Sequence, residues 1–150
     1  MKIYFDVSCL NRPFDDQQQP RIRLESESIV LILDEIDAGR WEQVSSRMAE
    51  IESQAISDEI RQRRVLALLP EGRIGLDQAV FGRARELIAV RIRAADAVHV
   101  AAAERLQADV LLTCDDQLLR AAQGIAHTLR VRVLNPVDWL REQINATIVE

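Results

Sequence analysis

Acidic residues stand at the ends of two apolar stretches that have the character of buried strands. Asp6 ends the first stretch, residues 2–6, and Asp115 and Asp116 follow the second, residues 109–113. In open α/β sheets, ligands gather at the carboxyl ends of the strands. A single aspartate there is more often a helix cap or a turn former. The case for chemistry therefore depends on several acids meeting at one edge.

Two further acids can reach the same edge. Asp96 begins a helical pattern, and Glu52 lies in a helix that starts after Ser46 and can carry its side chain back over the edge. Several carboxylates at one place repel one another unless divalent cations neutralise them. Oxygen ligands without a nearby pair of histidines or cysteines favour Mg²⁺ or Mn²⁺ over zinc. Such a site can activate a water and stabilise the charge on a phosphate during cleavage.

Four strands separated by helices have to position these acids. Their alternation predicts right-handed crossovers and a three-layer α/β/α sandwich around a central, mainly parallel sheet. Residues 10–20 are predicted to be an irregular polar loop. The predicted strands are residues 2–6, 41–45, 109–113 and 130–134. The predicted helices are residues 22–38, 47–55, 59–69, 78–92, 95–106, 116–123 and 136–146.

Length and composition exclude several classes of protein. A chain of 150 residues with 48% apolar and 29% charged residues fits one globular domain rather than a disordered or repetitive protein. Its 2 Cys and 2 His cannot make a disulfide framework or a structural zinc site. Without a signal peptide or membrane-spanning run, the expected location is the cytoplasm. The net charge of −5 means that any contact with nucleic acid must be local.

Four motifs, taken in their order along the chain, resemble a known family. They are Ile3-Tyr4-Phe5-Asp6-Val7-Ser8, then Val44-Ser45-Ser46 followed by Glu52, then Ala95-Asp96-Ala97-Val98-His99, and last Leu112-Thr113-Cys114-Asp115. Together they are similar to the motifs of the PIN domain, and among PIN domains to those of VapC-like toxins of bacterial toxin–antitoxin pairs. The resemblance covers nearly the whole chain, so a single PIN-like domain is expected over residues 1–150.

This resemblance implies a metal-dependent endoribonuclease that hydrolyses phosphodiester bonds in RNA. It also implies Mg²⁺ or Mn²⁺ as the cofactor, a cognate antitoxin as the partner, a homodimer, and no membrane. Ser8 and Thr113 would be hydroxyls that orient the carboxylates. The acids implied to be both catalytic residues and metal ligands are Asp6, Glu52, Asp96 and Asp115.

The choice among neighbouring acids stays open at this point. Glu50 lies two positions before Glu52, and Glu25 and Glu27 lie on the preceding helix. Residues two apart on a helix point to different faces, so Glu50 and Glu52 cannot both be ligands without distortion, and Glu52 is preferred.

Other residues near the motifs have two readings each. Asp115 fits the motif, whereas Asp116 is expected to be an N-cap or a peripheral ligand. His99 follows Asp96 by three positions, so it either touches the site or packs in the core. Several arginines, Arg93 among them, either rim the site and hold RNA phosphates or belong to a solvated face.

The main alternative function is a catalytically silent PIN-like module that binds RNA or a protein. Four intact acids argue against it, because a pure binding module has no reason to keep a self-repelling cluster. The nuclease prediction requires that the four side chains share one cavity with room for an ion. Scattered acids, or acids paired with arginines around no such space, would contradict it.

Overall fold

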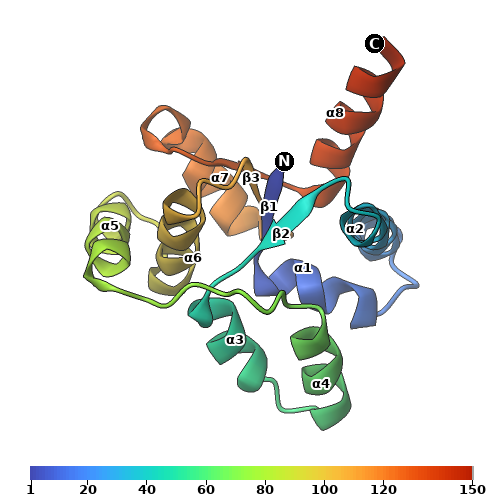
Figure 1. Cartoon of the computed structure of the whole chain (residues 1–150), viewed down its shortest axis with the longest axis horizontal. Helices are drawn as coiled ribbons and strands as arrows, with labels where there is room; N and C mark the ends of the chain where they lie inside the picture. The colour runs from blue at the N-terminus through green and yellow to red at the C-terminus, as the bar shows by residue number, and fades with distance from the viewer. Residues whose placement is uncertain (150) are drawn as a thin grey trace.

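Four short parallel strands form the centre of the molecule, and the computed structural model describes residues 1–149. The strand order is β2-β1-β3-β4, and each neighbouring pair is parallel. The central, mainly parallel sheet predicted from the sequence is therefore confirmed (Figure 1). The strands are β1 (Lys2–Phe5), β2 (Glu42–Val44), β3 (Val110–Leu112) and β4 (Arg132–Leu134).

Side chains alternate between the two faces of the sheet and divide the core in two. Tyr4 of β1 and Leu111 of β3 belong to one buried cluster. The residues on either side of Tyr4 in β1, Ile3 and Phe5, belong to the other buried cluster. The same cluster contains Val110 and Leu112, which flank Leu111 in β3. Successive side chains of a strand point to opposite faces, so these central strands need apolar residues at every position.

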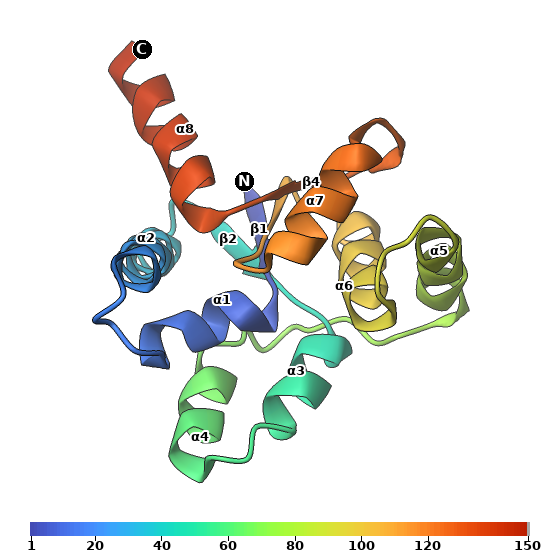
Figure 2. The same cartoon turned by 180° about the vertical axis from the view of Figure 1, so that it is seen from behind.

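Helices cover both faces, which confirms the three-layer α/β/α arrangement (Figures 1 and 2). One face carries α5 (Gln78–Ala89), α6 (Ala94–Arg105) and α7 (Asp116–Gly124). The other carries α1 (Val7–Asn11), α2 (Pro20–Asp37) and α8 (Pro136–Val149). On that side α3 (Arg47–Gln54) and α4 (Glu59–Ala67) pack against α1. A 3-10 turn, η2 (Ala126–Thr128), follows α7.

Helix ends follow the signals in the sequence. The Ser46 hydroxyl accepts a hydrogen bond from the Met48 N–H (3.2 Å) and caps α3. Asn135 caps α8 by accepting from the Val137 N–H (2.8 Å). Gly39, just after α2, has a φ of +81°, a left-handed conformation that glycine adopts without strain. Local capping chemistry therefore fixes where these helices start and stop.

The loop predicted for residues 10–20 is wrong in its first half. Residues up to 14 are helical, in α1 and in the 3-10 turn η1 (Arg12–Phe14), and only residues 15–19 are irregular before α2. Helix α1 has five residues, of which Val7, Cys9 and Leu10 are buried. So short a helix shows no periodic pattern and depends on tertiary packing.

Within residues 1–149, none of the helices combines the length and the apolar character needed to cross a lipid bilayer.

Candidate active site

One cavity, of about 310 Å³, lies beyond the carboxyl ends of the central strands. Asp6 follows β1 directly, Asp115 lies three residues after the end of β3, Asp96 lies in the first turn of α6, and Glu52 comes from α3. The four acids proposed from the sequence therefore do meet at one cavity, while their catalytic and metal-binding roles stay predictions. The lining consists of Asp6, Val7, Ser8, Glu52, Arg93, Ala95, Asp96, His99 and Asp115.

Asp6 is the most deeply buried of the four acids. Its residue is 4% exposed, and its carboxylate accepts hydrogen bonds from Ser8 Oγ (2.6 Å), the Cys9 N–H (3.0 Å) and Thr113 Oγ1. Burial raises the pKa of Asp6, and the two hydroxyl contacts oppose that rise. Ser8 and Thr113 thus hold this carboxylate in one orientation, as the sequence suggested.

Asp115 has a structural contact as well as a place at the cavity. Its Oδ1 accepts from the N–H groups of Gln117 (2.8 Å) and Leu118 (3.3 Å), which makes it the N-cap of α7. The expectation that Asp116 caps this helix is wrong, because the extended backbone that suits an N-cap occurs one residue earlier. Asp116 instead pairs with Arg21 at 2.8 and 2.9 Å, outside the cavity.

Arg93 supplies positive charge between two of the acids. Its guanidinium contacts Asp96 Oδ2 (3.0 Å) and also the Asp115 carboxylate. Burial raises the pKa of Asp96, and Arg93 opposes the rise. Within the described residues, no three acidic, histidine or cysteine side chains are already arranged as metal ligands. The Arg93 side chain is 54% exposed, so it can leave this position without disturbing the core.

Glu52 has a partner of another kind. Its carboxylate contacts Nε2 of His99, a histidine that is 2% exposed and lies on α6. Glu50 points elsewhere and pairs with Arg47 and with Arg73 (3.2 Å), so it does not line the cavity. This separation follows from the helix, on which residues two apart face different directions.

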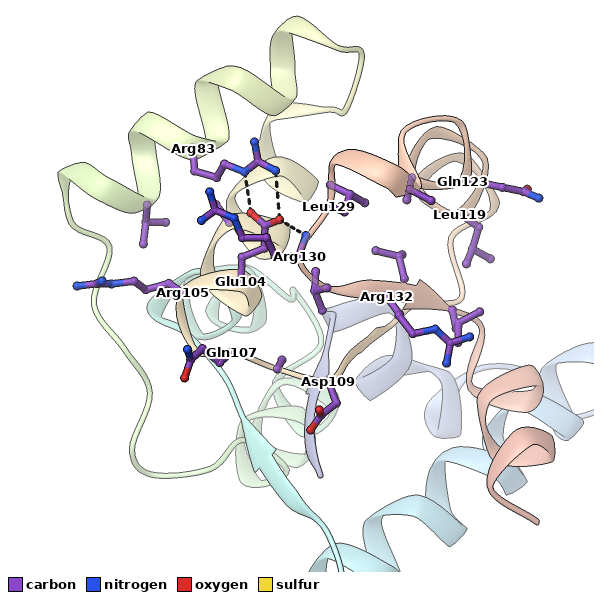
Figure 3. Close-up of a pocket in the computed structure, with 18 of the residues that line it drawn as sticks. Arg83, Glu104, Arg105, Gln107, Asp109, Leu119, Gln123, Leu129, Arg130 and Arg132 are labelled. Atoms are coloured by element: carbon purple, nitrogen blue, oxygen red, sulfur yellow. Dashed lines mark hydrogen bonds and ion pairs between the residues drawn. The ribbon is translucent and has the colours of Figure 1, made fainter. Parts of the chain in front are cut away.

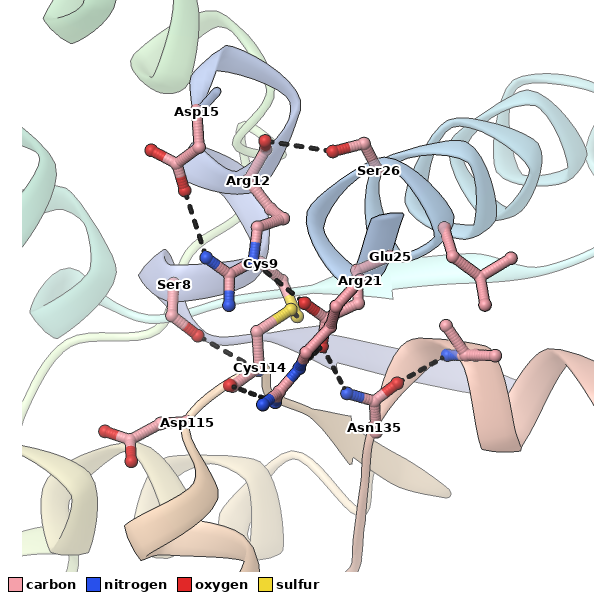
Figure 4. A network of polar contacts seen from close by, with 12 residues as sticks. Ser8, Cys9, Arg12, Asp15, Arg21, Glu25, Ser26, Cys114, Asp115 and Asn135 are labelled. Atoms are coloured by element: carbon pink, nitrogen blue, oxygen red, sulfur yellow. Dashed lines mark hydrogen bonds and ion pairs between the residues drawn. The ribbon is translucent and has the colours of Figure 1, made fainter. Parts of the chain in front are cut away.

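Glu25 and Glu27, the remaining acids left open by the sequence, also lie outside the cavity. Glu27 is exposed. Glu25 is buried in a network with Arg12 (3.0 Å), Arg21 (3.4 Å) and Asn135 (2.6 Å), seen in Figure 4. We call these four residues the Glu25 network. It joins α2 to η1 and to the start of α8.

A larger cavity, of about 1340 Å³, lies among α6, α7 and the edge strand β4 (Figure 3). None of the four proposed acids lines it. Its buried carboxylate, Glu104, is satisfied by Arg83 (2.7 Å) and by the Arg130 N–H (2.7 Å). This cavity is therefore separate from the acidic one and shows no unpaired buried charge.

The sequence did not reveal how the buried residues behind the acids are connected. Tyr4 was assigned only to a strand and Ser46 only to a helix start, yet their hydroxyl oxygens lie 2.7 Å apart, and Tyr4 Oη lies 2.7 Å from His99 Nδ1. The only sequence signal was the three-residue spacing of Asp96 and His99.

Cys9 and Cys114 are both buried and carry free thiols. Their Sγ atoms lie 3.7 Å apart.

Comparisons with known proteins agree with the fold described above. The structure is similar to the crystal structure of FitAcB from Neisseria gonorrhoeae, with a TM-score of 0.57 and 18% sequence identity. That similarity covers 89% of this chain and 97% of the other. No curated protein matches the sequence. The family model described as PIN domain matches residues 3–124, and the chain therefore belongs to the PIN domain family.

Proposed function

We propose that this protein is a metal-dependent endoribonuclease whose catalytic residues are Asp6, Glu52, Asp96 and Asp115. PIN domains are generally nucleases. The observation that carries the proposal is the meeting of these four carboxylates, from four separate elements, at one cavity. A cluster of like charges costs stability, so its presence calls for a cation as ligand.

The residues fit a hard divalent cation. All four acids offer carboxylate oxygens, which Mg²⁺ and Mn²⁺ prefer, and Arg93 is the one arginine among the residues that line the cavity. We propose that the four acids hold Mg²⁺ or Mn²⁺ once Arg93 has moved aside. Such a cation supplies water activation and neutralisation of the charge on the phosphate.

The protein's own side chains would prepare the site. Ser8 and Thr113 keep the Asp6 carboxylate in place, and the N-terminus of α7 does the same for Asp115. Arg93, at the mouth of the cavity, is free to bind a phosphate oxygen of the RNA after leaving the acids. Positioning of the substrate phosphate and fixing of the acids are thus assigned to different residues.

Two matched pairs of variants test the proposal. Each pair changes one acid at the cavity and its neighbour outside it, namely Glu52→Gln with Glu50→Gln, and Asp115→Asn with Asp116→Asn. The assay is cleavage of end-labelled RNA in Mn²⁺, in Mg²⁺ and in EDTA. We expect cleavage only with metal, strong loss in Glu52→Gln and Asp115→Asn, and nearly normal cleavage in the other two.

The other outcomes are equally informative. Equal loss within each pair would mean that the cavity is not the catalytic centre. Binding of RNA without cleavage, in either metal and with any RNA, would support the silent RNA-binding module instead.

We further propose that the protein is the toxin of a toxin–antitoxin pair, acts on RNA, binds a cognate antitoxin and forms a homodimer. The support is the resemblance of its motifs to those of VapC-like toxins. Expression should arrest growth, and co-expression of the neighbouring reading frame should relieve the arrest. Growth unaffected by the active enzyme would contradict the toxin role. A single monomer peak in sedimentation would contradict the dimer.

A further inference from the structure

A line of buried polar groups connects the interior of the protein to Glu52. Ser46 Oγ lies 2.7 Å from Tyr4 Oη, Tyr4 Oη lies 2.7 Å from His99 Nδ1, and His99 Nε2 contacts the Glu52 carboxylate. Ser46 and Tyr4 are fully buried and His99 is 2% exposed. The groups come from β1, α6 and the two ends of α3. None of the buried members can exchange its partner for bulk water without a change in packing.

The direction of the hydrogen bonds follows from the two ends of the line. The Met48 N–H can only donate, and it donates to Ser46 Oγ (3.2 Å). The ionised Glu52 carboxylate can only accept, so His99 Nε2 must carry a hydrogen. A neutral His99 then has an unprotonated Nδ1, which accepts from the Tyr4 hydroxyl, and the Tyr4 oxygen accepts from Ser46.

The opposite direction leaves groups unsatisfied. If Tyr4 donated to Ser46, the Ser46 hydroxyl hydrogen would lose this partner, and His99 Nδ1 would have to donate to Tyr4. A neutral ring would then present the Nε2 lone pair to a carboxylate, which is repulsive. Burial also raises the pKa of Tyr4, so its hydroxyl keeps its proton as a donor.

We propose that Tyr4 and Ser46 hold His99 as the Nε2–H tautomer, and that His99 is thereby the positioning residue for Glu52. Each acid of the cavity with a cap or hydroxyl contact is already fixed, as Asp6 and Asp115 are. Glu52 has a longer side chain that is 34% exposed, and His99 is the contact that orders it. The consequence for a cation rests on the proposed function, whereas the tautomer does not.

Nitrogen NMR of the metal-free protein tests the tautomer directly. The chain has 2 His, so His127→Gln assigns both rings in a long-range ¹H–¹⁵N spectrum. We expect a protonated Nε2 and an unprotonated Nδ1 for His99, and in Tyr4→Phe a shifted Nδ1 signal, because Nδ1 then loses the hydroxyl that donates to it. A protonated Nδ1 in the natural protein, or a spectrum that Tyr4→Phe leaves unchanged, would overturn the proposal.

Binding of Mn²⁺, followed by its paramagnetic resonance signal, tests the positioning role. Loss of a residue that orients a metal ligand weakens binding about 10- to 100-fold, which we expect for His99→Ala. His99→Gln can still donate from its amide to Glu52, so it should recover most of the affinity. Unfolding midpoints of both variants show whether they fold equally well.

The two measurements separate the possible failures. Equal affinities of well-folded His99→Ala and His99→Gln, with the natural protein binding normally, would refute the positioning role. If the natural protein binds no Mn²⁺, the proposed metal site fails, and the NMR result still decides the tautomer.

Discussion

The Glu25 network allows a quantitative prediction about stability. The Glu25 side chain is 2% exposed and contacts three partners, one of which, Arg12, is only 21% exposed (Figure 4). Glu25→Ala leaves the Arg12 guanidinium and the Asn135 amide without this carboxylate. Removing one partner of a buried ion pair costs about 3–5 kcal/mol.

The lower end of that range applies here. Arg12 keeps a contact with Asp15 (3.3 Å), and Arg21, which is 54% exposed, keeps Asp116. We therefore expect Glu25→Ala to lower the free energy of unfolding by about 3 kcal/mol. For a chain of this size the melting temperature falls by about 2–4 °C per kcal/mol, so the expected drop is about 6–12 °C.

Urea unfolding, followed by tryptophan fluorescence and far-ultraviolet circular dichroism, measures the change. Glu27→Ala is the matched control, because Glu27 is exposed on the same helix and its removal should alter stability by less than about 0.5 kcal/mol. Since Glu25 lies outside the acidic cavity, Mn²⁺ affinity should persist at temperatures where the variant is folded. A loss of stability no larger than that of the control, or a folded variant without Mn²⁺ binding, would refute this reasoning.

Three further predictions concern the cavity and the core. Arg93→Gln should strengthen Mn²⁺ binding measured by calorimetry, because Arg93 competes with the cation for the Asp96 carboxylate. Added salt should reduce this gain in affinity. Weaker Mn²⁺ binding by the variant would contradict the competition. The pKa of Asp6 is higher in the folded state than in the unfolded state. Protonation of Asp6 therefore adds to the free energy of unfolding of the metal-free protein at low pH, and this contribution is lost as the pH rises through the folded-state pKa. In urea titrations Asp6→Asn should therefore gain stability relative to the natural protein as pH increases, and a constant difference would show otherwise. Trp139 is 2% exposed and packs edge-on against Trp41, with 4.8 Å between the ring centroids. Trp139→Ala should lower the free energy of unfolding by about 3–5 kcal/mol. A loss below about 1 kcal/mol would mean that the Trp139 side chain is not packed as described.

The sequence by itself determined the order along the chain of the strands and of every helix except α1 and the 3-10 turns, and it predicted that the strands form a central sheet. Apolar runs at β1 and β3 indicated buried strands, and cap residues such as Ser46 and Asn135 marked helix starts. These signals are local, because propensity, capping and the period of apolar residues act within a few positions of the chain. The parallel sheet then followed from the alternation of elements, and it brought the strand-end acids to one edge.

Only the tertiary structure decided which charged side chains pair with one another. Glu50 and Glu25 have the same chemistry as Glu52, yet arginines from other elements bind them away from the cavity, while His99 binds Glu52. The cap of α7 at Asp115 and the hydrogen bonds of Tyr4 likewise depend on where distant segments come to lie. Pairing of side chains is set by distances of a few ångströms between residues far apart in sequence, and no local pattern encodes those distances.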